Sequence, residues 1–195
     1  SLHCQKQKLT VSDNENLLTV KNAYIEASFN KTTGQLVTLV MNGQQVVSQG
    51  GGFVYDNHRW IENDKFIETG NGLSEKGTCT VTEEKGNIIV ATNREGSLCS
   101  TDIVYTFTQT GVMDMEVVFR PHTADLRRCG LVANIDSTLN NIDYYAYGPW
   151  ENYNDRKDGC MVGRYTTTVE DMEVPYMKPQ SMGNREDLRE LTLYN

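Results

Sequence analysis

Hydrophobic and polar residues alternate with a period of two along much of the chain. In residues 23–30 (AYIEASFN), the apolar side chains that would share one face are Ala23, Ile25, Ala27 and Phe29. A strand that lies against a core sends successive side chains to opposite faces, so this pattern predicts a strand buried on one side. The same alternation returns in residues 79–92 and 103–119.

Short turn signals separate these alternating segments. Asn42-Gly43 stands between two apolar runs and is the dipeptide best suited to a tight type I′ hairpin. Gly34, residues 84–87 and Gly111 are further predicted turns. Because such short connections join neighbouring strands side by side, the pattern predicts an antiparallel meander.

The sequence therefore predicts an all-β fold. No apolar stripe with the 3.6-residue period of a helix has convincing length, although a short helical turn near residues 170–172 fits the sequence. Strands with one apolar face need a partner surface, so we expect two curved antiparallel sheets packed face to face. The length suits one unit of this kind, and we predict a single domain over residues 1–195.

Two segments lack clean alternation. Residues 57–74 are long for a loop in a compact domain, and residues 144–184 are polar and rich in aromatic side chains. Long connections without structure of their own are often functional. We therefore expect binding or catalytic residues in these two segments.

Composition and charge argue against several classes of function. The formal net charge of -8 comes without a stripe of Lys or Arg, which opposes binding to nucleic acid. No apolar run approaches the roughly 20 residues that cross a bilayer, so no membrane association is expected. The first ten residues lack the apolar core of a signal peptide. We expect a soluble protein whose compartment, cytoplasmic or periplasmic and secreted, stays open.

The five cysteines are scattered singly along the chain, with no pair at zinc-ligand spacing. Neither a metal site nor a cofactor is therefore expected. His3, His58 and His122 are isolated, with no nucleophile motif beside them, and are expected to be exposed or structural.

The strongest local signal is residues 145–157 (YAYGPWENYNDRK). The candidate binding or interface residues in it are Trp150, Glu151, Asn152, Tyr153, Asp155 and Arg156. Such mixtures suit sugars, whose C–H faces pack on aromatic rings while their hydroxyls pair with planar polar groups. The same residues also fit a Gly148-Pro149 turn and an internally bridged loop, in which Arg156 pairs with Glu151 or Asp155.

This run and the residues after it resemble the C-terminal small-chain domain of β-galactosidases of glycoside hydrolase family 2. Ordered segments of the family pattern are matched by Gly148, Pro149, Glu151, Asn152, Tyr153, Asp155 and Arg156, then by Tyr165, Val169, Pro175, Tyr176, Pro179, Gln180, Gly183 and Arg185. The pattern departs from the family at residues 181–182, where Ser and Met replace a usual Glu-Asn pair.

Weaker matches lie upstream. Residues 53–66 (FVYDNHRWIENDKF) resemble a family segment through Arg59, Asn63 and Asp64, which become further candidates for a binding or interface role. The family's opening hairpin is matched by Phe29, Gly34 and Leu36.

The resemblance implies an antiparallel supersandwich of the galactose-mutarotase type, and a chain that ends before the last strands of the family domain. Catalysis in this family comes from two glutamates of a separate (β/α)8 barrel of about 250 residues, for which this chain has no room. The resemblance thus implies a fragment that is inactive alone and assists a parent β-galactosidase in hydrolysing terminal β-galactosides. Its expected partners are the barrel, the parent's other domains and galactosides.

Two other functions fit parts of the sequence. A stand-alone carbohydrate-binding module would use Trp150 and Tyr153 as a stacking platform. An aldose epimerase, which fold analogy alone suggests, would need a histidine and a glutamate that converge on the sugar.

Overall fold

The computed structural model describes residues 5–48, 50–58, 76–124, 126, 128–174, 177 and 183–195. Antiparallel sheets make up the regular structure of these residues, which include one 3-10 turn and no α-helix. The all-β prediction is confirmed. Over the same residues there is no helix long and apolar enough to cross a bilayer. The described residues divide into two compact units, one up to Asp136 and one from Ser137 onward, and the expectation of a single domain stays a prediction.

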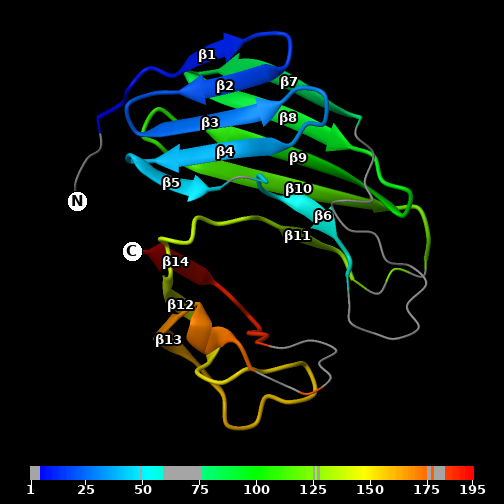
Figure 1. Ribbon diagram of the computed structural model, residues 1–195, viewed down its shortest axis with the longest axis vertical. Helices are drawn as coiled ribbons and strands as arrows, with labels where there is room; N and C mark the ends of the chain where they lie inside the picture. Colours follow the sequence, from blue (N-terminus) through cyan, green and yellow to red (C-terminus); the bar gives the residue numbers. More distant parts are fainter. Residues whose placement is uncertain are drawn as a thin grey trace. The chain divides into compact units, whose positions relative to one another are not determined.

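The first unit contains two large sheets, which Figure 1 shows as successive layers of blue and green strands. The five-stranded sheet has the order β1-β2-β3-β4-β5 and consists of β1 (Thr10–Asp13), β2 (Leu17–Lys21), β3 (Ile25–Asn30), β4 (Leu36–Met41) and β5 (Gln44–Val47). The four-stranded sheet has the order β10-β9-β8-β7 and consists of β7 (Gly77–Glu84), β8 (Asn87–Arg94), β9 (Cys99–Phe107) and β10 (Met113–Pro121). A small two-stranded sheet pairs β6 (Val54–Asp56) with β11 (Gly130–Val132). Each strand of the two large sheets pairs antiparallel with its sequence neighbours, which confirms the predicted meander.

The tight turns follow from local backbone chemistry. In the β4–β5 hairpin Met41 pairs with Gln44, so Asn42 and Gly43 alone form the loop. Both have positive φ, 50° and 78°, as a type I′ turn requires. Lys85-Gly86 makes the same kind of turn between β7 and β8, with φ values of 51° and 84°. The predicted hairpin turns are confirmed. Asn and Gly tolerate this left-handed backbone better than other residues, and Lys85 adopts it beside Gly86.

The inward faces of the two large sheets share one hydrophobic cluster. Phe29 of β3 is fully buried at its centre. Its ring centroid lies 4.9 Å from that of Tyr105 and 6.1 Å from that of Phe107, both of β9, in edge-to-face arrangements. Aromatic rings favour this geometry because the positive ring edge meets the negative ring face. Packing between β3 and β9 therefore joins the two layers.

The second unit is a three-stranded antiparallel sheet of order β13-β12-β14. It comprises β12 (Asn141–Gly148), β13 (Met161–Thr168), β14 (Glu190–Tyr194) and the 3-10 helix η2 (Glu170–Met172), which occupies the position of the predicted helical turn. Its buried cluster is small and consists of Ile142, Tyr144 and Ala146, all on one face of β12.

Strands β12 and β13 lie in the segment where no alternation predicted a strand. Burial does alternate along β12, but aromatic residues occupy both of its faces. Tyr144 points into the cluster, whereas Tyr145 and Tyr147 belong to the opposite face. Hydrophobicity does not alternate where both faces of a strand carry tyrosine, so the sequence pattern did not predict β12.

Candidate functional site

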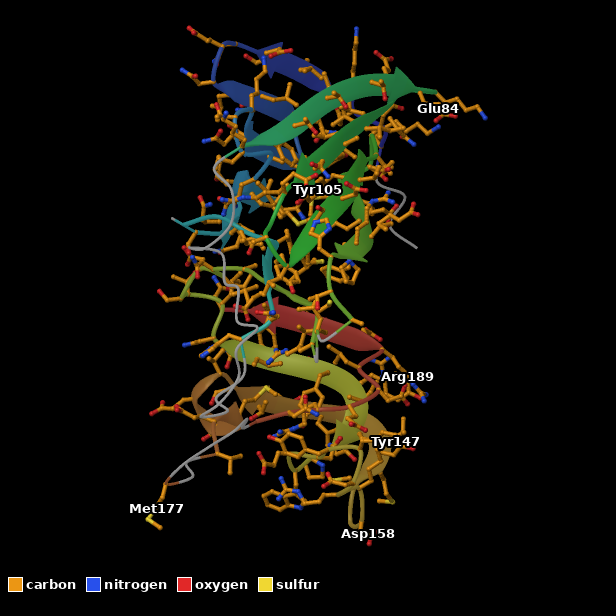
Figure 2. The ribbon with its side chains drawn as sticks, turned by 90° about the vertical axis from the view of Figure 1, so that its right-hand side faces the viewer. Glu84, Tyr105, Tyr147, Asp158, Met177 and Arg189 are labelled. Atoms are coloured by element: carbon orange, nitrogen blue, oxygen red, sulfur yellow. The ribbon has the colours of Figure 1, made fainter. Side chains whose placement is uncertain are left out.

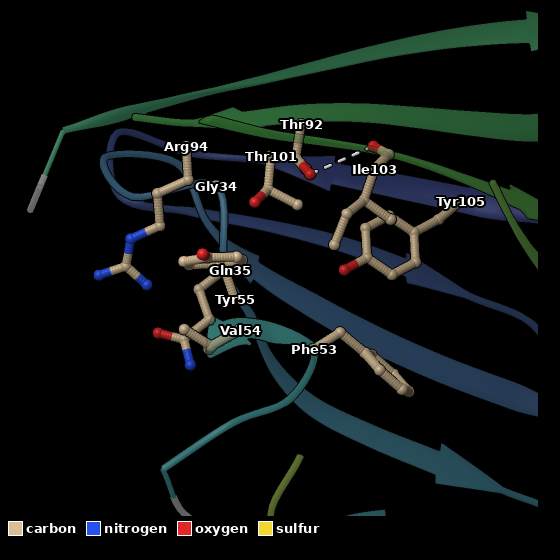
Figure 3. Close-up of a pocket in the computed structure, with 10 residues that line it drawn as sticks. All are labelled: Gly34, Gln35, Phe53, Val54, Tyr55, Thr92, Arg94, Thr101, Ile103 and Tyr105. Atoms are coloured by element: carbon tan, nitrogen blue, oxygen red, sulfur yellow. Dashed lines mark hydrogen bonds between the residues drawn. The ribbon is translucent and has the colours of Figure 1, made fainter. Parts of the chain in front are cut away.

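A small cavity in the first unit is lined by residues of β6, β8 and β9 and of the turn before β4 (Figure 3), among them Gln35, Thr92 and Tyr105. Its volume is about 20 Å³, which is enough for one water molecule. Thr92 Oγ1 donates to the Ile103 carbonyl at 3.2 Å, while the buried Thr101 Oγ1 has no hydrogen-bond partner among the described residues. This cavity is the size of a solvent site and too small for a sugar.

The loop between β12 and β13 carries most of the residues that the sequence marked as candidates. It begins at the Gly148-Pro149 peptide bond, which is cis, and its tip carries Asp158 (Figure 2). Tyr153 and Arg156 exchange backbone hydrogen bonds of 2.9 and 3.3 Å and so close a tight turn. The structure therefore contains the predicted turn at Gly148-Pro149 and, after it, the predicted internally bridged loop.

Asn152 is the most deeply buried polar residue of this loop, with no exposed surface. Its side-chain Nδ2 donates to the carbonyl oxygens of Tyr147 (3.0 Å) and Trp150 (3.1 Å), and its Oδ1 accepts from the Glu186 N–H (2.9 Å). Its backbone N–H donates to the Asn184 carbonyl (2.9 Å), and its carbonyl accepts from Asn184 Nδ2 (2.7 Å). The residue therefore fastens the loop to the segment that precedes β14.

Glu151 is the best-shielded carboxylate of the loop, with 11% of its side chain exposed. Its Oε2 accepts from the Gly183 N–H at 2.9 Å, and its Oε1 lies 3.8 Å from Arg156 Nη2. The Arg156 guanidinium also lies 4.8 Å from the centroid of the Tyr153 ring, a cation–π distance. Glu151, Tyr153 and Arg156 thus form one cluster, of the bridged kind that the sequence allowed.

Other candidates have different surroundings. Trp150 is 72% exposed, and Asp155 is exposed as well. Arg59, Asn63 and Asp64 fall outside the described residues. The structure therefore brings together Glu151, Asn152, Tyr153 and Arg156, and the role of all nine candidates in binding or in an interface stays a prediction.

A larger cavity, of about 510 Å³, lies in the second unit. We call it the second-unit cavity. Its described lining includes the aromatic residues Tyr144, Trp150 and Tyr165 and the charged residues Glu151, Asp171, Glu173 and Arg185. Trp150 and Glu151 of this set are among the candidates that the sequence predicts. Arg185 could have been found from its place in the family pattern, whereas Tyr144 and Tyr165 become neighbours only through the β12–β13 register.

The opposite face of the same sheet is a charged surface. Two arginines lie against the Tyr145 ring, with Cζ atoms 5.1 Å (Arg164) and 5.3 Å (Arg189) from its centroid. Arg164 Nη2 also donates to Glu190 Oε2 at 2.6 Å, and this hydrogen bond lowers the pKa of the Glu190 carboxyl below its usual value. Such exposed pairs contribute little to stability because water screens them, so this face is a solvated surface.

Ser100 and His122 meet in the first unit, which no sequence spacing indicated. Ser100 Oγ lies 2.8 Å from His122 Nε2 and also binds Glu95 Oε2. A catalytic serine must be reachable by substrate, and its histidine is oriented by an acid on the other ring nitrogen. Here Ser100 is buried and Glu95 binds the same hydroxyl, so the cluster ties β9 to the residues at the end of β10. This agrees with the structural role expected for His122.

No group of three or more metal-ligating side chains occurs in the part of the chain that the structure describes. Four cysteines within that part, Cys79, Cys99, Cys129 and Cys160, are free thiols.

We expect Cys79 to resist alkylation. Burial raises the pKa of its thiol to about 11, against about 8.5 for an ordinary cysteine, so at pH 8 roughly one molecule in a thousand carries the reactive thiolate. In a time course with iodoacetamide at pH 8, followed by peptide mass spectrometry, the exposed Cys129 should be modified at least about tenfold faster than Cys79. Equal rates at the two thiols would show that Cys79 is not shielded in solution.

Comparison with known proteins relates the chain to one family over most of its length. The family described as the β-galactosidase small chain matches residues 21–195. A β-galactosidase of Priestia megaterium is 27% identical over 204 aligned residues, which cover 96% of this chain and 19% of that protein. The β-galactosidase of Lactococcus lactis is 28% identical over 95% of this chain and 21% of its own length. That of Streptococcus thermophilus is 44% identical over 64 residues, 33% of this chain and 6% of its own length. The chain thus spans about a fifth of the length of the first and second of these relatives.

Proposed function

Because the chain belongs to the β-galactosidase small-chain family, we propose that it is a non-catalytic accessory domain of a longer β-galactosidase. The observation that carries the proposal is the share of the relatives that it matches. Nearly the whole chain corresponds to 19% of one relative and 21% of another. A retaining glycosidase uses two carboxylates about 5–5.5 Å apart, and a barrel that holds such a pair takes about 250 residues. That machinery would lie in the remaining four-fifths.

The position of Glu151 supports a non-catalytic role. A general acid must donate a proton to the leaving group, whereas Glu151 accepts a hydrogen bond from Gly183 and lies beside the Arg156 guanidinium. Its carboxylate is thereby engaged in holding the loop together. In this proposal, residues 148–156, which match the family pattern best, stabilise the structure of the accessory domain.

Exposed apolar side chains in the second unit support docking on the rest of a parent chain. Among the described residues, large exposed hydrophobic side chains are more frequent in this smaller unit, which has Trp150, Met161, Val169, Met177, Leu188, Leu191 and Tyr194, than in the first, which has Val11, Leu17, Val112, Val118 and Val132. In this proposal these side chains become buried where the unit docks on the rest of the parent chain. The partner that we propose is the other four-fifths of the parent, including its barrel.

The same proposal extends to the fold. We infer that the two large sheets of the first unit belong to a supersandwich of the galactose-mutarotase type. The hydrophobic cluster shared by the two large sheets supports this inference.

The test compares the isolated chain with its parent. Residues 1–195 alone should not hydrolyse a chromogenic β-galactoside, and the full-length parent should. In the parent, the double variant Leu188→Asp/Leu191→Asp should lower activity or assembly because it places charges in the proposed interface. Val112→Asp, at an exposed valine of the first unit, is the matched control and should leave both unchanged. Turnover by the isolated chain would contradict the proposal.

A stand-alone carbohydrate-binding module is the second candidate, and the exposure of Trp150 favours it. Tyr153 is less suited than Trp150 to stack on a sugar, since the Arg156 guanidinium lies against its ring. A module of this kind would bind sugar without any help from a parent enzyme, which separates it from a purely accessory domain.

A further inference from the structure

Aromatic rings of two paired strands line the second-unit cavity. Tyr144 of β12 and Tyr165 of β13 have their ring centroids 5.5 Å apart. Their hydroxyls donate to the carbonyls of Pro149 (3.1 Å) and Met161 (2.8 Å), so the rings present mainly apolar surface. The volume of about 510 Å³ lies within the range of about 300–1,000 Å³ that is usual for binding pockets and has room for a long side chain.

Two carboxylates that line this cavity are not paired with a cation among the described residues. Asp171 belongs to η2 and Glu173 directly follows it, and both residues are exposed. Asp171 Oδ2 accepts a hydrogen bond from Thr168 Oγ1 at 2.9 Å. No ion pair within the described part of the chain includes Asp171 or Glu173. Both carboxylates can therefore accept hydrogen bonds from a cation that enters the cavity.

The other two charged groups of the lining are engaged within the loop. Glu151 accepts from the Gly183 N–H at 2.9 Å and lies beside Arg156. Arg185 Nη1 donates to the backbone carbonyls of Gly183 (3.1 Å) and Asn184 (3.2 Å). With the Glu151–Arg156 pair set aside, two carboxylates stand against one guanidinium, so the lining carries one negative charge in excess. This excess attracts a monovalent cation and opposes a phosphate, a sulfate or a carboxylate.

Trp150 supplies an aromatic ring that a cation can reach. The residue lines the cavity and is 72% exposed, so its contact with a ligand needs no rearrangement of the loop. A cation is attracted to the face of an aromatic ring, most strongly to that of Trp. Arg makes this contact more often than Lys, because its planar guanidinium stacks on the ring and also forms paired hydrogen bonds with carboxylates. The lining thus suits an arginine side chain.

We propose that the second-unit cavity is a docking site for an arginine side chain of the remaining parent chain. Its guanidinium stacks on Trp150 and pairs with Asp171 or Glu173, while its aliphatic stem packs on the tyrosine rings. The inference rests on the proposed accessory role and deepens it, because it states which chemistry of the parent this unit recognises.

The experiment is a calorimetric titration of residues 1–195 with the peptide acetyl-Gly-Arg-Gly-amide. Saturable binding in the millimolar range is expected, and it should weaken as salt is added. The matched ligand is the same peptide with citrulline in place of arginine, which has nearly the same shape but no charge. It should bind at least about tenfold more weakly, because it lacks the attraction to the carboxylates and to the indole ring.

Variants of the chain locate the binding. Trp150→Ala should weaken binding of the arginine peptide by about fivefold through loss of the cation–π contact. The double variant Asp171→Asn/Glu173→Gln should weaken it by about tenfold through loss of both carboxylates. Asp114→Asn/Glu116→Gln, at exposed positions of β10 in the first unit, removes the same charge from the chain. This matched control should bind the peptide as the unsubstituted chain does.

Several outcomes would overturn the proposal. Absence of saturable binding would do so, as would equal binding of the citrulline peptide. An equal loss of affinity in the β10 control would show that the peptide responds only to the overall charge of the chain. Unchanged binding in cavity variants that melt as the unsubstituted chain does would also overturn it. A negative titration leaves the accessory role standing, whereas hydrolysis by the isolated chain would contradict that role without bearing on the affinity of the cavity for a guanidinium.

Discussion

Replacing Asn152 by alanine is expected to lower the free energy of unfolding of the second unit by about 2–4 kcal/mol. The substitution removes the side-chain hydrogen bonds to the carbonyls of Tyr147 and Trp150 and to the N–H of Glu186. Asn152 is completely buried, so water cannot replace these partners without opening the loop. Urea unfolding followed by circular dichroism, together with hydrogen exchange of the Glu186 amide, measures the loss.

Asn154→Ala is the matched control for this prediction. Asn154 lies two residues further along the same loop but is exposed, so its replacement should change the free energy of unfolding by no more than about 0.5 kcal/mol. Equal effects of the two substitutions would show that Asn152 does not fasten the loop as described.

Asn152→Asp tests the direction of these hydrogen bonds. The variant keeps the shape of the side chain, but it turns the Nδ2 donor into a carboxylate oxygen that faces two carbonyls. Burial beside carbonyls disfavours the charged form, so the pKa of the new carboxyl in the folded state should rise above its unfolded value of about 3.9. The variant should therefore be least stable at neutral pH and should recover part of its stability as the pH falls toward 4.

Phe29→Ala is expected to have the largest effect in the first unit, a loss of about 3–5 kcal/mol. Phe29 is fully buried between the two large sheets, and its ring contacts Tyr105 and Phe107 of the facing sheet. Truncation would remove those contacts and leave a cavity that the paired strands cannot close, because their backbones are held in register by hydrogen bonds. Urea unfolding monitored by near-ultraviolet circular dichroism reports on the tyrosine packed against it.

Val118→Ala serves as the control, since Val118 lies on the exposed face of β10. It should change the free energy of unfolding by no more than about 0.5 kcal/mol. Should Phe29→Ala cost less than about 1 kcal/mol, the two large sheets would not depend on this contact and the described core would be wrong in its main feature.

Much of the first unit could be predicted from the sequence because the relevant physics is local. The Asn42-Gly43 turn needs positive φ at both positions, and Asn and Gly are the residues that tolerate it best. Alternation in residues 79–92 and 103–119 predicted strands β7 to β10, because each strand has one face against the shared cluster. The family pattern, a further property of the sequence, is likewise confirmed over residues 21–195.

The candidate site was less accessible to sequence reasoning. Composition marked residues 145–157 as a candidate site, which stays a prediction, and it could not distinguish a residue that holds the loop from one that faces a cavity. Asn152 and Trp150 are two residues apart, yet one is fully buried and the other is 72% exposed. Their difference arises from the segment before β14, whose Glu186 and Asn184 backbones pair with Asn152.

Strands β3 to β5 and β7 to β10, the tight turns and the family could be predicted from the sequence, since these depend on the preferences of neighbouring residues and on the order of matched motifs. Contacts between distant groups became visible only in the three-dimensional fold: Glu151 meets Gly183, Ser100 meets His122, and Tyr144 meets Tyr165. The physical reason is that pairing between segments many residues apart is set by sheet register and by the closure of loops, and neither of these leaves a periodic signal in the chain.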